Sequence, residues 1–417
     1  MLPESLTAVT LPLDGDAPLL QLSDPAAPLL WSRRGDGMVG IGEALRLEFR
    51  GANRIAQAAA AWRELAARTH VTDPLGLPGT GLVAFGTFAF SDRSALPSVL
   101  IVPERIVGVR DGQWWLTQIR SGEAVAGSTP PAAPPALPAA TAFGIPARAT
   151  FRTGTQGRDE FVSAVRRAVE HIQAGRLEKT VLARDAVADL PAGSDLRTAL
   201  DALVTGYPDC WTFAVDGFIG SSPETLIQVS QASFSARVLA GSMARGEDAA
   251  SDTEAAVQLA TSAKDLDEHQ FAVRSVTSAL RSHATALSVS ELPFTLKLPN
   301  LWHLASDVEG TLGDGSSSLD LVEALHPTAA VAGTPRAEAL AVIDELEPFD
   351  RGRYAGPVGW IDGNGDGEWA VAVRSAQVSH EGLITAYAGC GIVAESEPER
   401  ELAETSMKFR PIVEAFR

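Results

Sequence analysis

The order of the expected strands and helices constrains the fold of this chain most. Between residues 82 and 118, short apolar runs alternate with turn residues, as in antiparallel strands. Further strand patterns return in groups at 211–215, 225–229, 234–239, 356–361, 368–378 and 383–388. The regular alternation of strand and helix that builds a parallel sheet is missing. We therefore expect a large antiparallel α+β fold.

Helices are expected between these groups of strands. Residues 53–69 form an alanine-rich helix pattern with Trp62 near its apolar face, and a second helix pattern ends before Gly175. A long helix is expected over 252–283, and a last one starts near Glu397.

A stretch rich in proline and alanine interrupts the chain at residues 122–147. Such a composition stays extended and packs poorly, so it is expected to be a linker. The strands of residues 1–121 alone would leave sheet edges unpaired. We therefore expect one domain over 1–417, in which 1–121 complete the sheets and 148–417 carry the functional site.

The charge and the cysteines exclude several classes of function. The chain has 52 acidic and 34 basic residues, a formal net charge of -18, which disfavours nucleic acid or an anionic membrane as partner. The two cysteines, Cys210 and Cys390, form neither a disulfide framework nor a thiolate zinc motif. Neither a secretion signal nor an apolar run of the roughly 18 residues needed to cross a membrane is recognisable. We expect a cytoplasmic protein.

Two residues at strand ends are candidates for acid–base chemistry. Glu224 follows the turn that starts at Gly220, between two expected strands, and a buried carboxyl there could stay protonated and act as an acid. Lys179 begins a strand pattern, and an amine whose pKa is lowered could act as a base. The alternatives are an ordinary turn carboxylate and a lysine whose amine lies in solvent.

Two expected helices carry acidic pairs three residues apart. Asp265 and Glu268 lie on the long helix, and Glu401 and Glu404 lie on the last one, with Lys408 one turn further on. Such pairs repel on a bare helix, and a hard cation such as Mg²⁺ would relieve the repulsion. The alternative is a solvated helix face in an acidic chain.

Other motifs are less specific. The run 362–367 begins like a calcium loop but lacks the required final glutamate, so it is expected to be a hairpin turn. Gly389 opens a GxGxxA pattern without the strand and helix that dinucleotide binding requires. His303 has apolar neighbours and is either a core histidine or a pocket residue. Arg374, expected within the strand 368–378, must face solvent or meet an anion.

Together these segments resemble the chorismate-utilising enzymes, and most closely the members that form isochorismate, which are related to anthranilate synthase component I and salicylate synthase. The matching stretches cover nearly all of the chain after the proline-rich segment, at 179–184, 220–224, 239–242, 264–269, 298–304, 326–333, 345–360, 367–374 and 388–408. The resemblance implies two large antiparallel sheets packed face to face, with helices on the outside.

The resemblance also implies a mechanism. Lys179 would activate water for attack at C2 of chorismate, and Glu224 would protonate the departing C4 hydroxyl. Mg²⁺ would be held by Glu268 and Glu404, with Asp265 and Glu401 behind bound waters. The substrate would be contacted by residues on several segments, namely Gly241, His303, Ala330, Val331, Arg374, Gly389 and Lys408.

Several alternatives remain. Members that add ammonia lack the lysine at the position of Lys179, and salicylate synthases tend to carry threonine where Ala330 stands, so isochorismate is the expected product and salicylate the alternative. A protein that binds chorismate without converting it is the alternative of another class. No glutamine amidotransferase partner is expected, and the protein is expected to be a monomer or a weak homo-oligomer. Both menaquinone and siderophore biosynthesis would use the product.

Overall fold

The structure is a computed structural model that describes residues 5–14, 17–122, 137, 139–297 and 301–417. Within these ranges, the side chains of Lys264 and Glu268 are not described. Most of the segment at 122–147 lies outside the described residues, so its extended conformation stays a prediction. None of the helices in the described ranges is long and apolar enough to cross a membrane.

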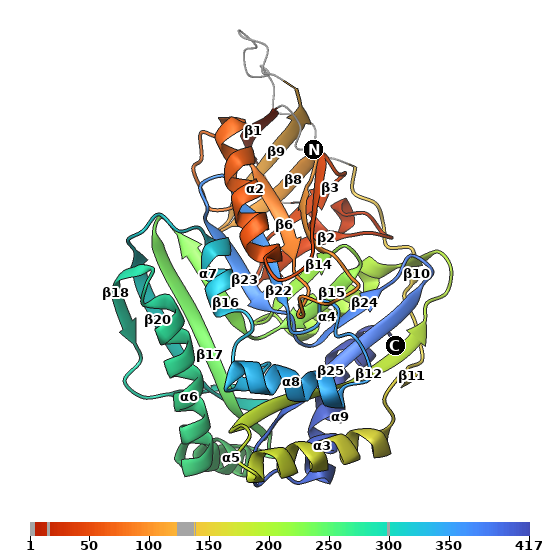
Figure 1. Cartoon of the computed structure of the whole chain (residues 1–417). Coiled ribbons are helices and arrows are strands. Elements are labelled where there is room, and N and C mark those ends of the chain that lie inside the picture. Colours follow the sequence, from red (N-terminus) through yellow and green to blue (C-terminus); the bar gives the residue numbers. More distant parts are fainter. Residues whose placement is uncertain (1–4, 15–16, 123–136, 138, 298–300) are drawn as a thin grey trace.

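Two large sheets contain nearly all the described strands (Figure 1). The first has 13 strands in the described part of the chain, in the order β11 (Arg152–Thr153), β12 (Lys179–Asp189), β25 (Leu383–Ile392), β24 (Ser375–Val378), β15 (Phe218–Ser222), β14 (Trp211–Val215), β2 (Leu29–Arg33), β3 (Asp36–Ile41), β8 (Arg105–Arg110), β9 (Gln113–Ser121), β1 (Leu6–Leu13) and β5 (His70–Thr72), with β21 (Gly333–Thr334) beside β12. The second has ten strands among the described residues, in the order β18 (Ala284–Val289), β20 (Leu301–Leu312), β17 (Ser233–Ala244), β16 (Thr225–Ser230), β23 (Gly367–Val371), β22 (Pro357–Asp362), β6 (Val83–Thr87), β7 (Ser98–Val102) and β4 (Leu45–Phe49), with β19 (Phe294–Lys297) beside β20. A short parallel pair joins β10 (Ile145–Pro146) to β13 (Ser194–Asp195).

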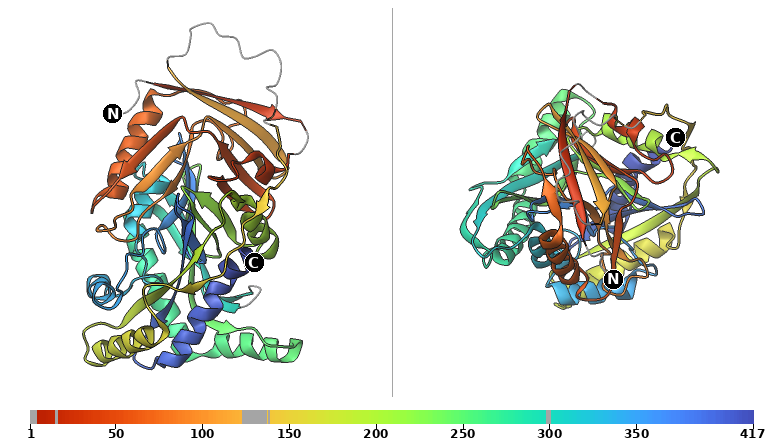
Figure 2. Two further views of the ribbon diagram at one scale, coloured as in Figure 1. Left: turned by 90° about the vertical axis from the view of Figure 1, so that its right-hand side faces the viewer. Right: turned by 90° about the horizontal axis from the view of Figure 1, so that it is seen from above.

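Apart from the parallel pair β1–β5, the strand neighbours in both sheets are antiparallel. Strands from before residue 122 extend both sheets: β1, β2, β3, β5, β8 and β9 belong to the first, and β4, β6 and β7 to the second. They form the upper end of the molecule in Figures 1 and 2. The expected α+β class with two large antiparallel sheets is confirmed.

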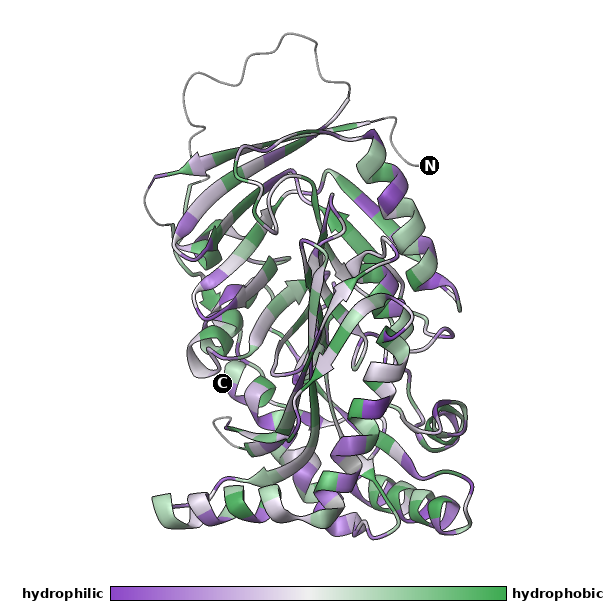
Figure 3. Cartoon of the chain, turned by 90° about the vertical axis from the view of Figure 1, so that its left-hand side faces the viewer, coloured by the Kyte–Doolittle hydropathy of each residue, from purple (hydrophilic) through white to green (hydrophobic). Residues whose placement is uncertain are grey.

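Helices cover the outer surfaces of the sheets. Their bounds are α1 (Leu19–Leu22), α2 (Arg54–Arg68), α3 (Arg158–Gln173), α4 (Leu196–Gly206), α5 (Ala249–Thr261), α6 (Ala263–Leu280), α7 (Ser318–Leu325), α8 (Arg336–Leu346) and α9 (Pro398–Ala415). In α2, Ile55, Trp62 and Leu65 are buried as their spacing predicts, and the Trp62 indole donates to the Asp362 carbonyl at 2.7 Å. Figure 3 shows mostly apolar strands in the centre and mixed polar and apolar residues on the outer helices.

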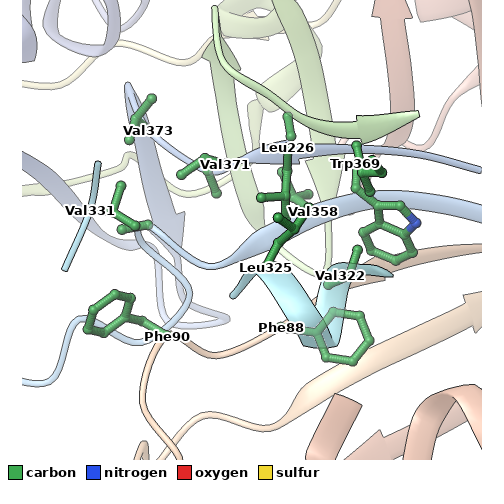
Figure 4. Packing of buried hydrophobic residues seen from close by; sticks show 14 of the residues in the cluster. Phe88, Phe90, Leu226, Val322, Leu325, Val331, Val358, Trp369, Val371 and Val373 are labelled. Atoms are coloured by element: carbon green, nitrogen blue, oxygen red, sulfur yellow. The ribbon is translucent and has the colours of Figure 1, made fainter. Parts of the chain in front are cut away.

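The core has two parts, because strand side chains alternate between the faces of a sheet. The main cluster includes Trp31 of the first sheet and Trp369 of the second. A second cluster includes Leu30 of the first sheet, and α4 and α9 contribute Leu200 and Ile412 to it. Figure 4 shows part of the main cluster, in which Trp369 packs on Phe88, with ring centroids 5.6 Å apart.

The chain passes between the two sheets at two adjacent crossovers. Pro223 and Glu224 connect β15 of the first sheet to β16 of the second, and residues 372–374 connect β23 of the second sheet to β24 of the first. Backbone hydrogen bonds join the crossovers: Ser221 N donates to Arg374 O at 3.1 Å, and Val371 N donates to Glu224 O at 3.0 Å. The two connections therefore form one fixed unit.

The expected single strand over 368–378 was wrong for this reason. The chain leaves the second sheet after Val371 and enters the first at Ser375. Between them Arg374 has a φ of 54°, in the left-handed region. The apolar pattern continues through the crossover because both sheets bury their strands. The sequence pattern therefore does not show that the chain changes from one sheet to the other.

The expected single helix over 252–283 was also wrong. It divides at Ser262, which has extended backbone angles and whose side chain accepts the Asp265 backbone N–H at 3.3 Å. Serine competes with the helix backbone for such bonds and is favoured at helix starts. The division places Asp265 in the first turn of α6.

We predict that Ser222→Ala destabilises the protein. The Ser222 hydroxyl is fully buried, donates to Val371 O at 2.6 Å and accepts the Glu224 backbone N–H at 3.2 Å. Removing it takes this acceptor from the Glu224 N–H and leaves Val371 O with the Val373 N–H as its donor, so the free energy of unfolding should fall by about 1–3 kcal/mol. Urea unfolding measures the loss. Ser230→Ala, at an exposed position of β16, is the control, and equal midpoints for both variants would contradict the prediction.

Candidate active site

A cavity of about 190 Å³ lies at the two crossovers. Strands β12, β17, β20 and β25 and helices α6 and α9 contribute to its lining. All the expected site residues whose side chains are described line it, namely Lys179, Glu224, Gly241, Asp265, His303, Ala330, Val331, Arg374, Gly389, Glu401, Glu404 and Lys408. Glu268 belongs to α6, but its side chain lies outside the described residues.

Glu224 has the character of a proton donor. It is half-buried on the crossover between β15 and β16, where its backbone bonds to Ser222 and Val371 hold it in place. Burial raises the pKa of Glu224 from 4.5 to about 7, and the nearby Arg374, Lys179 and Lys408 offset only part of that effect. A carboxyl with such a pKa is substantially protonated at neutral pH and can donate to a leaving group.

Lys179 brings an amine to the same cavity. It is the first residue of β12 and pairs with Thr334 of β21. Side chains two residues apart on a strand point to the same face, and both Lys179 and Val181 line the cavity. The structure therefore places an amine and a protonatable carboxyl around one enclosed space.

Three carboxylates form the acidic part of the cavity. Asp265 comes from α6, and Glu401 and Glu404 come from α9. Burial, together with the neighbouring Glu404, raises the pKa of Glu401. Burial acts in the same direction on Glu404, but Lys408, whose Nζ is 2.5 Å from its Oε1, together with Arg374 and Lys179 outweighs burial and lowers the pKa of Glu404.

These carboxylates match the donors of a hard divalent cation. Oxygen ligands suit Mg²⁺, which keeps several waters and takes only one or two direct carboxylates. Burial and the neighbouring Glu404 raise the pKa of Glu401, and Lys408 acts in the opposite direction. No three described His, Cys, Asp or Glu side chains form a complete ligand group, and Glu268, the fourth expected ligand, is not among the described side chains. The chemistry of the donor set fits a hydrated Mg²⁺.

His303 is a neutral residue of the cavity rather than a fully bonded core histidine. Its Nδ1 lies 2.8 Å from the Ser242 hydroxyl and 3.3 Å from the Gly241 carbonyl, whereas its buried Nε2 has no hydrogen-bond partner among the described residues. Burial, with Arg374 and Lys408 nearby, lowers the pKa of His303 to about 3. With the proton on Nδ1, Nε2 is an acceptor for a bound hydroxyl.

Two cationic side chains, Arg374 and Lys408, line the cavity near Gly389, where the backbone of β25 is tightly packed against its neighbours. Arg374 lies on the second crossover, and the Lys408 amine donates to Gly389 O of β25 at 3.0 Å. A Cβ at Gly389 would lie 2.9 Å from Leu182 O and 3.1 Å from the Tyr354 hydroxyl, so this position requires glycine. The cavity can therefore accept an anionic ligand against Arg374 and Lys408.

The sequence analysis missed several lining residues, among them Ser242, Tyr354, Cys390 and Ser396. Tyr354 is buried and stacks on Tyr387 with ring centroids 5.3 Å apart, and burial raises its pKa to about 12. Burial beside Glu401 and Glu404 raises the pKa of Cys390 well above its usual value, so it remains a thiol. Ser242, Tyr354 and Cys390 lie within segments whose sequences resemble the family. That resemblance is the signal by which they could have been found.

The cavity brings Lys179 and Glu224 together with Arg374 and Lys408, an arrangement found at the crossovers of two large antiparallel sheets. The family model described as chorismate binding enzyme matches residues 19–417, and the chain belongs to this family. The resemblance noted in the sequence is thereby confirmed.

Individual relatives agree with this assignment. The chain is 39% identical over 270 residues to isochorismate synthase DhbC of Bacillus subtilis, a match covering 62% of this chain and 68% of that protein. It is 34% identical over 353 residues to the putative isochorismate synthase MenF of Mycobacterium tuberculosis, covering 81% of this chain and 87% of that one. The crystal structure of a putative 2,3-dihydroxybenzoate-specific isochorismate synthase, DhbC, from Bacillus anthracis is similar with a TM-score of 0.77 and 31% identity, covering 95% of this chain and 98% of that one.

We predict that Gly241→Ala weakens Mg²⁺ binding. Gly241 has a φ of +79° at a bulge between β17 and β20, and a Cβ there would lie 3.2 Å from Asp265 Cβ and 3.3 Å from its Oδ1. Alanine should lower the free energy of unfolding by about 1–2 kcal/mol through its backbone angle and should also displace Asp265.

Gly112→Ala is the matched control, because Gly112 has a φ of +76° with nothing within 4 Å of its Cβ position. Urea unfolding and calorimetric Mg²⁺ titration measure both effects. If the two variants bind Mg²⁺ equally, Gly241 has no influence on the acidic part of the cavity.

Proposed function

We propose that the protein is an isochorismate synthase, which converts chorismate to isochorismate. The main support is that one cavity contains Lys179, the protonated Glu224 and an acidic cluster suited to a divalent cation. The similarity to proteins named isochorismate synthases supports the same activity.

The proposed reaction adds one water and releases another. Lys179 takes a proton from water while the water oxygen bonds to C2 of the ring. The ring double bonds shift, the C4–O bond breaks, and Glu224 gives its proton to the leaving hydroxyl. Lys179 then holds one more proton and Glu224 one fewer, so Lys179 must release a proton and Glu224 must take one up before the next turnover.

Charge complementarity supports chorismate as the substrate. Chorismate carries two carboxylates, and Arg374 and Lys408 supply positive charge in a chain whose formal net charge is -18. We propose that Mg²⁺ is also bound, with Glu268, Glu404, Asp265 and Glu401 as its direct or water-mediated partners. When bound, the ion would neutralise a substrate carboxylate and help to orient the ring.

Two residues that line the cavity, Ala330 and Val331, favour isochorismate over salicylate as the product. Salicylate formation requires a further elimination of pyruvate, and the enzymes that perform it tend to carry threonine at the position of Ala330. Here Ala330 and Val331 line the cavity with apolar groups. The product could supply either menaquinone or siderophore biosynthesis.

The decisive experiment is to incubate the protein with chorismate and Mg²⁺, with and without EDTA, and to identify products by chromatography with mass detection. We expect isochorismate only when the metal is present. Salicylate with pyruvate would show that the protein is a salicylate synthase instead. Unreacted chorismate that still binds would indicate a binding protein.

Lys179→Ala should bind chorismate in calorimetry but lose turnover, and unchanged turnover would contradict the role of Lys179 as base.

We predict that the Glu224 carboxyl loses its proton as the pH rises through about 7. Burial raises the pKa of Glu224 to about 7, so its protonated form, which the proposed reaction requires, is full below that pH and declines tenfold per unit above it. Infrared difference spectra from pH 5 to 9, with the carboxyl band assigned by its loss in Glu224→Gln, measure the titration. A Glu224 carboxyl that is already ionised at pH 5 would contradict its role as the acid.

A further inference from the structure

A buried ion pair lies directly behind the cavity. Glu347 follows α8, and Arg351 is four residues later; their side chains are 3% and 2% exposed. The guanidinium contacts the carboxylate twice, with Nε 2.8 Å from Oε2 and Nη2 2.6 Å from Oε1. The planar group also stacks over Phe90 at 4.4 Å. Neither Glu347 nor Arg351 lines the cavity.

The pair completes an open stretch of the edge of β12. On the side of β12 away from β25, β21 pairs only with Lys179 and Thr180, and β11 pairs only from Ala186 onward. Between these positions, Arg351 Nη2 donates to Val181 O at 2.7 Å, and Ala183 N donates to Glu347 Oε1 at 2.7 Å. Two side chains thus take the hydrogen-bonding role of a missing strand segment.

The same guanidinium binds a second segment of the cavity lining. Arg351 Nη1 donates to Val331 O at 2.9 Å, in the turn that carries Ala330. Figure 4 shows Val331 close to Phe90, the ring on which Arg351 stacks. Val181 N also donates directly to Ala332 O at 2.9 Å, so Arg351 adds two bonds to those that hold the strand of Lys179 to the turn of Ala330.

We propose that the Glu347–Arg351 pair positions Lys179 for proton abstraction, acting through the backbone of Val181 and Val331. Arg351 touches neither substrate nor cofactor, so it is a positioning residue. The inference rests on the proposed isochorismate synthase activity. A lysine in its place would keep the charge but could not make the planar set of bonds to Glu347, Val181 and Val331 together.

Arg351→Lys is the test variant. We expect kcat to fall about 100-fold, because a shift of about 1 Å in a catalytic group has an effect of this size, while KM for chorismate changes less than about threefold. Hydrogen exchange at 179–184 and 328–333 should become about tenfold faster as the backbone bonds weaken.

Arg197→Lys is the matched control. Arg197 forms a similarly buried pair with Asp195, with side chains 1% and 2% exposed, and neither residue lines the cavity. Its loss should destabilise the protein comparably but leave kcat and the exchange of 179–184 unchanged.

The outcomes separate this inference from the proposed function. If the wild-type protein forms no isochorismate, the proposed function fails. Hydrogen exchange still tests the role of Arg351 in that case, and exchange in Arg351→Lys equal to that of the wild type would show that Arg351 does not hold the backbone in place. If the wild type is active, equal kcat in Arg351→Lys and Arg197→Lys shows that Arg351 is only structural. A large loss of kcat in Arg351→Lys alone, with faster exchange at both segments, supports the inference.

Discussion

The two hydrogen-bonded crossovers between the sheets determine where the active site lies. A strand that leaves one sheet for another must expose backbone groups at the transition, and each crossover here satisfies groups of the other. Because the crossovers are side by side, Glu224 and Arg374 reach the same cavity although they are 150 residues apart in sequence. Strands β12, β17 and β25 surround this fixed unit and bring the remaining groups to it.

Burial and neighbouring charges give the glutamates of the cavity different roles. Among the described side chains, three glutamates line it, and each has a different surrounding. Burial dominates for Glu224, a second carboxylate adds to burial for Glu401, and nearby cations, Lys408 foremost, outweigh burial for Glu404. Glu224 is therefore suited to hold a proton and Glu404 to hold a negative charge. Residue type alone does not distinguish an acid from a cation ligand; the neighbouring charges do.

Much of this could be predicted from the sequence, and the failures have a common cause. Strand bounds such as β14 and the start of β12 at Lys179 follow from alternation and turn residues, and the site residues follow from a family resemblance. The division of the helix at Ser262 and the change of sheet near Arg374 depend on tertiary partners that local patterns do not contain. Tyr354 and the Glu347–Arg351 pair were missed because their positions reveal a role only when distant strands are assembled.

The buried ion pairs show why charged groups persist in an apolar core. Burying two charges carries a desolvation penalty, and well-packed apolar residues would often be as stable. An apolar pair, however, cannot bind the backbone of several segments at once. Arg351 joins β12 to the turn at Val331, and Arg197 likewise bonds to the carbonyls of Ser23 and Ala142, which are far apart in sequence. In both places the charge fixes the relative position of segments. At Arg351 those segments carry the proposed base and the cavity-lining residues Ala330 and Val331.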